Sequence, residues 1–330
     1  MVNWLIIGTG DIVRKRAAAA IASEARSQIR AFCSRSQQHA QELADQYSAT
    51  VYTDLTAALQ DKDIDAVYIA TPVFLHVPMA IECLKANKHV LVEKPLSLSH
   101  AQAQELIEVS RKTDVKCAVA YYRRYYPKYA EARDMLKNGE FGQVVLIRMT
   151  YFAWTNPPAD SPRSWSITPD KAGGGPLYDM GCHMLDVMIG LFGLPESVYA
   201  RVETLTHDYP VEDSSVVIMK YKDGPQVIAS FNWNSKTWSH EFEIVGTEAK
   251  VKWHPYDAKD IVKTTGRDIE KIELPNAENI HTPLIEDFVS SLVDGKEPQT
   301  TVIEAAKTNL LLDAIGLSAR KNREVKIDDF

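Results

Sequence analysis

The amino-acid sequence predicts an α/β fold, with an N-terminal doubly wound parallel sheet and a C-terminal α+β domain that has a large, mostly antiparallel, open-faced sheet. Over the first 120 residues, short apolar runs alternate with helical stretches, a pattern typical of βαβ units. Further along, strand-like runs follow one another, and turn signals such as Lys222-Asp223-Gly224-Pro225 join them into hairpins. The change of pattern predicts two domains, residues 1–122 and residues 123–330.

The apolar runs of the first half are short and almost continuously hydrophobic, as expected of strands that are covered on both faces of a sheet. The expected strands span residues 4–7, 29–33, 66–70, 90–92 and 115–119. The expected helices span about residues 12–23, 37–47, 75–86 and 99–112. Strands that alternate with helices in this way predict a parallel sheet.

The second half begins with a helix from Pro127 to Lys137, which Asn138-Gly139 ends. Strand-like runs then dominate, with a second hairpin signal at Gly246-Thr247-Glu248. The expected strands span residues 144–152, 198–206, 216–221, 226–233, 241–245 and 250–253, and two helices at about 280–294 and 302–320 close the chain. Consecutive hairpins build an antiparallel sheet, which can leave one face uncovered.

Composition excludes several classes of partner. The 330 residues carry a formal net charge of −7, which disfavours nucleic acid or an anionic membrane as partner. No apolar run reaches the length of a membrane span, and the N-terminus lacks the features of a signal peptide. The four cysteines form no C-x-x-C pair, so we expect buried, reduced thiols in a cytoplasmic protein. Cys182-His183 has no second ligand pair, so no metal site is expected.

A glycine-rich segment, Gly8-Thr9-Gly10-Asp11-Ile12, follows the first strand and opens the first helix. Gly8 permits a tight turn, and Gly10 lets the main chain approach a pyrophosphate that lies on the helix N-terminus. Val13 replaces the third glycine of the full fingerprint, and a pair of turn glycines is the simpler explanation. The position of the glycine-rich segment within a βαβ series favours a dinucleotide-binding site.

The end of the second strand distinguishes the two nicotinamide cofactors. An acidic residue at this point contacts the ribose 2′-hydroxyl in NAD-specific sites, but here the chain reads Ser34-Arg35. A hydroxyl followed by a guanidinium suits a 2′-phosphate, although a solvated loop arginine would look the same. We therefore predict NADP(H), with NAD(H) as the alternative.

Lys94 follows a buried strand in the segment Val90-Leu91-Val92-Glu93-Lys94-Pro95. Ligands of open parallel sheets lie at the carboxyl ends of the strands, where a lysine can donate a hydrogen bond to a substrate oxygen. Desolvation can also lower the pKa of such a lysine toward acid–base use. A surface lysine at a strand end is the alternative.

Three glycines and Pro176 introduce a second polar segment, on a helix that we expect to end near Gly193. Asp179, His183 and Asp186 follow at helical spacing and share one face. Three ionisable groups are costly to bury on an apolar helix without a purpose. A helix-cap aspartate and a core histidine are the structural alternative.

The sequence resembles the glucose–fructose oxidoreductase / inositol dehydrogenase / rhizopine-catabolism (Gfo/Idh/MocA) family over about residues 3–320. The matching motifs, in order, are GTGDI, TPVFLH at 71–76, VLVEKP at 90–95, AYYRRYYP at 120–127 and GGGPLYDMGCHMLD at 173–186. The resemblance implies an N-terminal NAD(P)-binding Rossmann domain and a C-terminal domain for substrate binding and oligomerisation. It also implies hydride transfer between NAD(P) and a hydroxyl or carbonyl carbon, and a homodimer or homotetramer formed through the C-terminal sheet.

The resemblance also implies roles for individual residues. Lys94 would be the catalytic lysine at the reacting oxygen, while Asp179 and His183 would orient the substrate, with His183 moving the proton. The further cofactor-binding residues would be Thr71, Pro72, His76, Glu93, Arg124 and Trp165, beside Gly8, Thr9, Gly10, Asp11, Ile12, Ser34 and Arg35. The substrate cleft would be aromatic, formed by Tyr121, Tyr122, Tyr151, Phe152, Trp154 and Trp165.

The resulting hypothesis is an NADP(H)-dependent oxidoreductase that acts on a sugar, a cyclic polyol or a sugar derivative. Ser166 after the tryptophan, and Tyr121-Tyr122, depart from the pattern of the family's anhydrofructose reductases. The alternatives are a dihydrodiol or biliverdin-type reductase on the same fold, and a non-catalytic NAD(P)-binding sensor.

Overall fold

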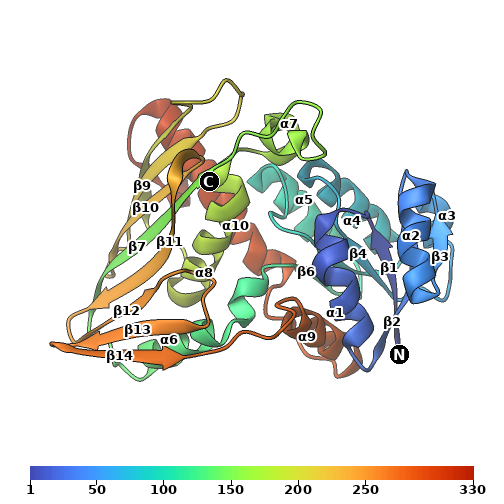
Figure 1. Ribbon diagram of the computed structural model, residues 1–330, viewed down its shortest axis with the longest axis horizontal. Helices are drawn as coiled ribbons and strands as arrows, with labels where there is room; N and C mark the ends of the chain where they lie inside the picture. The colour runs from blue at the N-terminus through green and yellow to red at the C-terminus, as the bar shows by residue number, and fades with distance from the viewer. The chain divides into compact units, whose positions relative to one another are not determined.

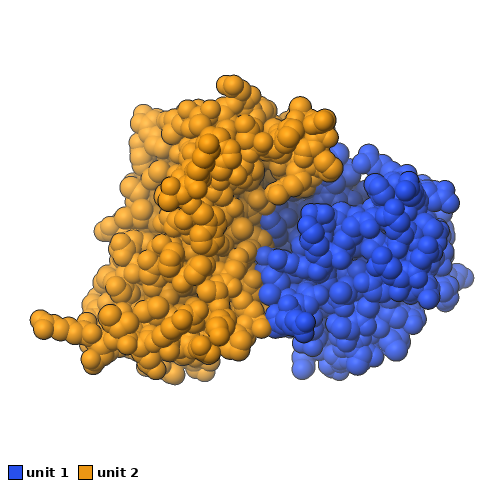
Figure 2. Space-filling view, in the orientation of Figure 1, with its two compact units in different colours: residues 1–122, 277–306 blue, residues 123–276, 307–330 orange.

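The computed structural model describes residues 1–330 and divides the chain into two compact units (Figures 1 and 2). Unit 1 comprises Met1–Tyr122 and Ala277–Ala306, and unit 2 comprises Arg123–Asn276 and Lys307–Phe330. Residues 277–306 therefore belong to the first unit, whereas the sequence placed them in the second domain. The reason is a long-range contact: Phe288 of α9 (Thr282–Val293) packs on Trp4, with ring centroids 5.5 Å apart.

Unit 1 is built on a six-stranded parallel sheet with the order β3-β2-β1-β4-β5-β6. Its strands are β1 (Val2–Ile7), β2 (Ser27–Cys33), β3 (Thr50–Tyr52), β4 (Ala66–Ile69), β5 (His89–Val92) and β6 (Cys117–Val119). Its helices are α1 (Ala18–Ser23), α2 (Gln37–Tyr47), α3 (Leu55–Leu59), α4 (His76–Lys85), α5 (His100–Ser110) and α9. This is the strand order of a dinucleotide-binding Rossmann sheet, as predicted.

Fully buried strands explain why the apolar runs of unit 1 are continuous rather than alternating. Every residue of β4 is buried, and Val90–Val92 of β5 are 0% exposed. Both faces of a parallel sheet are covered by the crossover helices, so each strand residue contacts one layer or the other. The sequence analysis missed β3 and α3, because they are only three and five residues long and no residue of β3 is buried.

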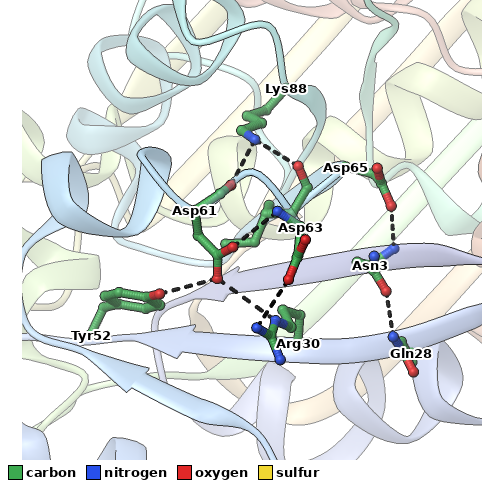
Figure 3. A network of polar contacts seen from close by, with 9 residues as sticks. Asn3, Gln28, Arg30, Tyr52, Asp61, Asp63, Asp65 and Lys88 are labelled. Atoms are coloured by element: carbon green, nitrogen blue, oxygen red, sulfur yellow. Dashed lines mark hydrogen bonds and ion pairs between the residues drawn. The ribbon is translucent and has the colours of Figure 1, made fainter.

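A polar network connects the segments that precede β4 and β5 with residues of β2 and β3 (Figure 3). The buried Lys88 ammonium donates to the main-chain carbonyls of Asp61 and Ile64, at 2.9 and 2.7 Å. The Asp61 carboxylate accepts a hydrogen bond from the Tyr52 hydroxyl and lies 3.7 Å from Arg30 Nε. The network therefore joins the segments that lead into β4 and β5 to two other strands of the same sheet.

Unit 2 is built on a nine-stranded sheet with the order β14-β13-β12-β11-β7-β10-β9-β8-β15. The strands are β7 (Val144–Trp154), β8 (Ser197–Glu203), β9 (Ser214–Lys220), β10 (Gln226–Asn232), β11 (Asn234–Gly246), β12 (Ala249–Trp253), β13 (Asp260–Thr265), β14 (Asp268–Glu273) and β15 (Val325–Lys326). Only β7 and β10 pair in parallel. Both predicted hairpins are confirmed, β9–β10 around Gly224 and β11–β12 around Thr247.

One face of this sheet is covered and the other is open. The helices of unit 2 are α6 (Pro127–Lys137), α7 (Pro169–Ala172), α8 (Cys182–Phe192) and α10 (Val302–Lys321), the last of which begins in unit 1. Ser318 of α10 accepts a hydrogen bond from Ala200 of β8, while Val216, Ile218 and Ile228 stay about half exposed. The open-faced sheet predicted from the hairpins is therefore present.

The four cysteines are free and buried, as predicted. Burial raises the pKa of the Cys33 thiol to about 11 and that of the Cys117 thiol to about 12, which keeps both thiols protonated and unreactive. None of the helices combines the length and the apolar character that crossing a membrane requires.

Candidate functional site

Most of the predicted cofactor-binding residues lie at the carboxyl edge of the unit 1 sheet. Ile7 of β1 is in register with Cys33 of β2 and with Ile69 of β4, which is itself in register with Val92 of β5. The segments that follow these strands therefore start side by side. They contain Gly8, Thr9, Gly10, Ser34, Arg35, Thr71, Pro72, Glu93 and Lys94.

The glycine-rich segment after β1 has two glycines with different tasks. Gly8 has φ +102°, and a Cβ there would lie 2.4 Å from the Ala70 carbonyl oxygen, so no larger residue fits. Gly10 faces open space, because a Cβ at this position would have no atom within 4 Å of it. Gly8 thus lets β1 and β4 approach, and Gly10 leaves the helix N-terminus accessible to a ligand.

The helix that follows departs from the expected regular form. Its first part, η1 (Val13–Ala17), is a wide π-type turn, and Ile12 is its N-cap. Val13, at the position of the missing third glycine, is fully buried. Asp11 is exposed and pairs with Lys15 at 2.7 Å. Arg14, which the sequence did not single out, donates to the Thr9 carbonyl at 3.0 Å and so fixes the glycine-rich segment.

The segment after β2 carries a hydroxyl and a guanidinium but no carboxylate. The Ser34 hydroxyl lies 3.4 Å from the Thr9 hydroxyl and accepts a hydrogen bond from the Ser36 main chain at 3.2 Å. The Arg35 side chain is exposed beside them. Thr71, after β4, has a buried hydroxyl oxygen without a hydrogen-bond partner. An open glycine, an exposed arginine and an unpaired buried hydroxyl at one sheet edge fit a dinucleotide.

His76 supports this edge from within. The imidazole is 1% exposed, and its two nitrogens lie 2.9 Å from the carbonyl oxygens of Thr71 and Pro95. Burial lowers the pKa of His76, against the effect of these carbonyls. The side chain therefore links the segments after β4 and β5, and its predicted place in the cofactor groove stays a prediction.

Glu93 is buried directly before Lys94. Its carboxylate accepts a hydrogen bond from the Tyr68 hydroxyl at 2.5 Å and one from the Lys94 main chain at 3.1 Å, and His281 lies 3.6 Å away. Burial acts to raise the pKa of Glu93, but His281, Tyr68 and Lys94 outweigh it and lower the pKa. Lys94 itself is half-buried and is followed by a cis peptide bond to Pro95.

In unit 2, Asp179 and His183 lie on one continuous helix. The helix begins with a π-type turn, η5 (Leu177–Gly181), and continues as α8. Asp179 falls in the wide turn and is half-buried, whereas His183 is 2% exposed. Such wide turns within helices are frequent at functional sites, and the sequence predicted a regular helix instead.

Asp186, which the spacing placed on one helix face with Asp179 and His183, pairs with Arg124. Its carboxylate receives two hydrogen bonds from the Arg124 guanidinium, at 2.7 and 2.8 Å, and both side chains are at most 4% exposed. A bidentate pair of this kind is strong and directional. Arg124 and Asp186 therefore anchor α8 internally, and the predicted cofactor role of Arg124 stays a prediction.

The three glycines before this helix allow close contacts with other parts of the protein, namely the Glu212 main chain and the Tyr178 ring. A Cβ on Gly175 would lie 2.0 Å from the Glu212 carbonyl oxygen, and Cβ atoms on Gly173 and Gly174 would meet the Tyr178 ring. The Glu212 carboxylate accepts hydrogen bonds from the main chains of Gly175 at 2.8 Å and Leu177 at 3.1 Å. Glu212, which the sequence did not reveal, therefore caps the helix that carries Asp179 and His183.

The aromatic residues predicted to line the substrate cleft differ in burial and in the surface that they face. Tyr121 is fully buried and belongs to the core, and Tyr122 is 6% exposed. Tyr151 packs on the buried cluster of Tyr209, Val211 and Trp233, whereas Phe152, the next residue of β7, points to the opposite face of the sheet. Trp154 is 45% exposed, with the Lys236 ammonium 4.9 Å from its ring centre. Trp165 lies partly buried in η4 (Ser164–Ile167).

A Rossmann sheet with this glycine-rich edge, followed by an α+β unit with an open sheet, defines the class of two-unit, dinucleotide-binding oxidoreductases. Residues 2–121 match the Gfo/Idh/MocA "Oxidoreductase family, NAD-binding Rossmann fold", and residues 129–252 match the "GFO/IDH/MocA C-terminal domain". The chain belongs to the Gfo/Idh/MocA family of oxidoreductases.

Individual relatives match the chain over all or part of its length. Oxidoreductase P35 of Formosa agariphila is 28% identical over 318 residues, 94% of this chain and 97% of that protein. The trans-1,2-dihydrobenzene-1,2-diol dehydrogenase of Xenopus laevis is 34% identical over 173 residues, 52% of this chain and 50% of that protein. Among solved structures, levoglucosan dehydrogenase in complex with NADH and levoglucosan shares the fold, with a TM-score of 0.90 at 22% identity and 99% of each chain covered.

Glu212 should make stability depend on pH. Burial raises its pKa to about 7, above the ordinary value of 4.5, so the folded chain keeps a proton that the unfolded chain releases between these values. The stability gained from this proton is complete below the lower pKa and is lost as the pH rises through the upper one. Relative to Glu212→Gln, the wild type should lose on the order of 2 kcal/mol of unfolding free energy over this range. Chemical denaturation of both proteins across the range checks this, and a constant difference would contradict it.

Proposed function

We propose that this protein transfers a hydride between NADP(H) and a hydroxyl or carbonyl carbon of a sugar, a cyclic polyol or a sugar derivative. The observation that carries the proposal is Lys94, half-buried at the sheet edge that also holds Gly10 and the unpaired hydroxyl of Thr71. Membership of an oxidoreductase family supports it, as do relatives named for sugar substrates, such as levoglucosan dehydrogenase.

The chain's own residues would bind, orient and exchange a proton. When bound, the nicotinamide supplies or accepts the hydride. Lys94 would donate a hydrogen bond to the reacting oxygen, where its charge stabilises negative charge that develops in the transition state. His183 would give the oxygen its proton in reduction or take it in oxidation, and Asp179 would orient the substrate. The position of Lys94 after β5 supports its assignment, and the helix that carries both Asp179 and His183 supports theirs.

NADP(H) is the cofactor we propose over NAD(H). Ser34 and Arg35 follow β2, where a 2′-phosphate would lie, and neither residue is acidic. The Ser34 hydroxyl is held near Thr9, so Arg35 alone supplies positive charge from this segment. The nicotinamide itself is the same in both cofactors, so the choice between them concerns this end of the site only.

Arg35→Ala should therefore weaken NADPH binding about tenfold or more and leave NADH binding within about twofold, because a charge-assisted contact to the 2′-phosphate is lost. Titration of each cofactor by nicotinamide fluorescence measures both constants. Arg30→Ala, in the middle of β2 where Arg30 pairs with Asp61 and Asp63 (Figure 3), is the matched control and should change neither. Equal losses for NADPH and NADH in Arg35→Ala would contradict the assignment.

The reaction is tested by following the absorbance of the reduced nicotinamide with sugars, inositols, dicarbonyls and dihydrodiols. Lys94→Met should lower kcat/KM on the accepted substrate about a hundredfold or more, because the donor to the reacting oxygen is lost. Lys85→Met, an exposed lysine of α4, is the control and should behave as wild type. Unchanged turnover in Lys94→Met would refute the role of Lys94. Tight NADPH binding without turnover on any class would favour a sensor.

A dihydrodiol reductase is the second candidate. The specific observation in its favour is the 34% identity to a trans-1,2-dihydrobenzene-1,2-diol dehydrogenase over about half of this chain. Both candidates use the same cofactor edge and the same proton-handling residues, so they differ only in the substrate. Preferred turnover of dihydrodiols over sugars in the assay above would select the second candidate.

We further propose that the chain forms a homo-oligomer through the open face of the unit 2 sheet. Tyr199, Ile218, Ile228 and Arg148 are in register across four neighbouring strands, and Arg148 donates to Glu243 of the next strand at 2.6 Å. A half-exposed apolar patch beside a charged pair is typical of an interface between copies.

Ile218→Glu should convert the oligomer to a particle of 37.0 kDa, because it buries an unpaired charge in the proposed interface. Sedimentation equilibrium measures the mass. Val293→Glu in α9, where the side chain is exposed to the same 50% as Ile218, is the matched control and should leave the mass unchanged. A wild type that is already monomeric would contradict the proposal.

A further inference from the structure

His281 is fully buried beside the proposed catalytic strand end, although it belongs to a segment that follows β5 by almost 190 residues. The imidazole is 0% exposed and neither ring nitrogen has a hydrogen-bond partner. Its Nε2 atom lies 3.6 Å from the Glu93 carboxylate. Buried polar atoms are rarely left unpaired, so an imidazole in this state requires an explanation.

The position of His281 is set from both sides. Its main-chain N–H donates to the Asn279 side chain at 3.1 Å, and the Asn279 amide donates to the Arg16 carbonyl at 2.8 Å. Its ring lies against the Tyr122 ring, with centroids 4.6 Å apart and planes 30° apart. The backbone anchor and the ring contact therefore hold the imidazole beside Glu93.

Glu93 joins three groups that would otherwise be independent. One carboxylate oxygen faces both Tyr68, at 2.5 Å, and His281, at 3.6 Å, and the other accepts the Lys94 main-chain N–H at 3.1 Å. Tyr68 belongs to β4, Glu93 follows β5, and His281 precedes α9. A carboxylate held from three elements is a rigid support for the residue that comes after it.

We propose that His281 is a positioning residue of the hydride-transfer reaction: it holds the Glu93 carboxylate against Tyr68, and through Glu93 it fixes the main chain from which Lys94 projects. This inference rests on the function proposed above for Lys94. His281 contacts no reacting atom. Removing it takes away one of the two polar side-chain groups that face this carboxylate oxygen, so Glu93 and Lys94 gain freedom.

The test compares His281→Phe, which keeps the ring contact with Tyr122 but removes both nitrogens, with His281→Gln, which restores an N–H donor. His281→Phe should lower kcat about 10- to 100-fold, the cost of a small misplacement of a reacting group, with the NADPH dissociation constant changed less than about threefold. His281→Gln should recover part of kcat. Tyr68→Phe combined with His281→Phe should be non-additive, because both act through Glu93.

Phe288→Leu is the matched control for a merely structural role. It disturbs the packing of the same segment on Trp4 but does not touch Glu93. It should lower the Tm at least as much as His281→Phe and leave kcat unchanged. A kcat of His281→Phe within about twofold of wild type, or an equal loss of kcat in Phe288→Leu, would overturn the proposal.

A second readout does not depend on turnover. Carboxyl NMR of isotope-labelled glutamate, assigned to Glu93 with Glu93→Gln, follows the titration of Glu93 directly. Because His281 helps to lower the pKa of Glu93, His281→Phe should raise it. An unchanged pKa refutes the contact. If His281→Phe raises the pKa of Glu93 but Lys94→Met leaves turnover unchanged, the contact between His281 and Glu93 exists but the function proposed for Lys94 is wrong. The positioning role of His281 in that reaction is then refuted as well.

Discussion

The close approach of two strand ends is the constraint on which the site in unit 1 depends. At Gly8 the main chain passes so near the Ala70 carbonyl that a Cβ would lie 2.4 Å from it. Between β1 and β4 the order of the strands reverses, and in open α/β sheets ligands bind beside such a point. Gly10, two residues further along, has open space around it. Gly8 is needed for the fold, and Gly10 is the glycine that we propose for the approach of a ligand.

In the second unit, a glycine allows the capping of a helix. Gly175 lets the Glu212 main chain approach the start of a helix, and the Glu212 carboxylate then satisfies two of the N–H groups that every helix N-terminus leaves unpaired. Further along the same helix, Asp186 is held by Arg124. The helix is therefore fixed at both ends of its polar stretch. Asp179 and His183, which we propose for substrate binding and proton transfer, lie between these two anchors.

Local signals predicted the fold well, and long-range contacts account for what they missed. The helices 37–47 and 127–137 and both hairpins were predictable because caps, proline and turn residues lie within the segments themselves. The return of 277–306 to the first unit was not predictable, because it depends on Trp4 and Phe288 meeting across the chain.

The same limit applied to the candidate site. Lys94, Asp179 and His183 stood out by their position in short motifs. His281 and Glu212 did not, because their partners are distant in sequence. Asp186 was grouped with Asp179 on spacing alone, and only the structure revealed that the buried Arg124 guanidinium donates two hydrogen bonds to it.

Isotope transfer tests the central claim, that the chain moves a hydride between the nicotinamide and a carbon of its substrate, most directly. Wild-type protein would be incubated with NADPH deuterated at the transferring position of C4 and with a panel of keto-sugars and inososes. Mass spectrometry of the products should find one deuterium on the carbon that becomes the alcohol. Firm NADPH binding with no deuterium in any product would contradict the account.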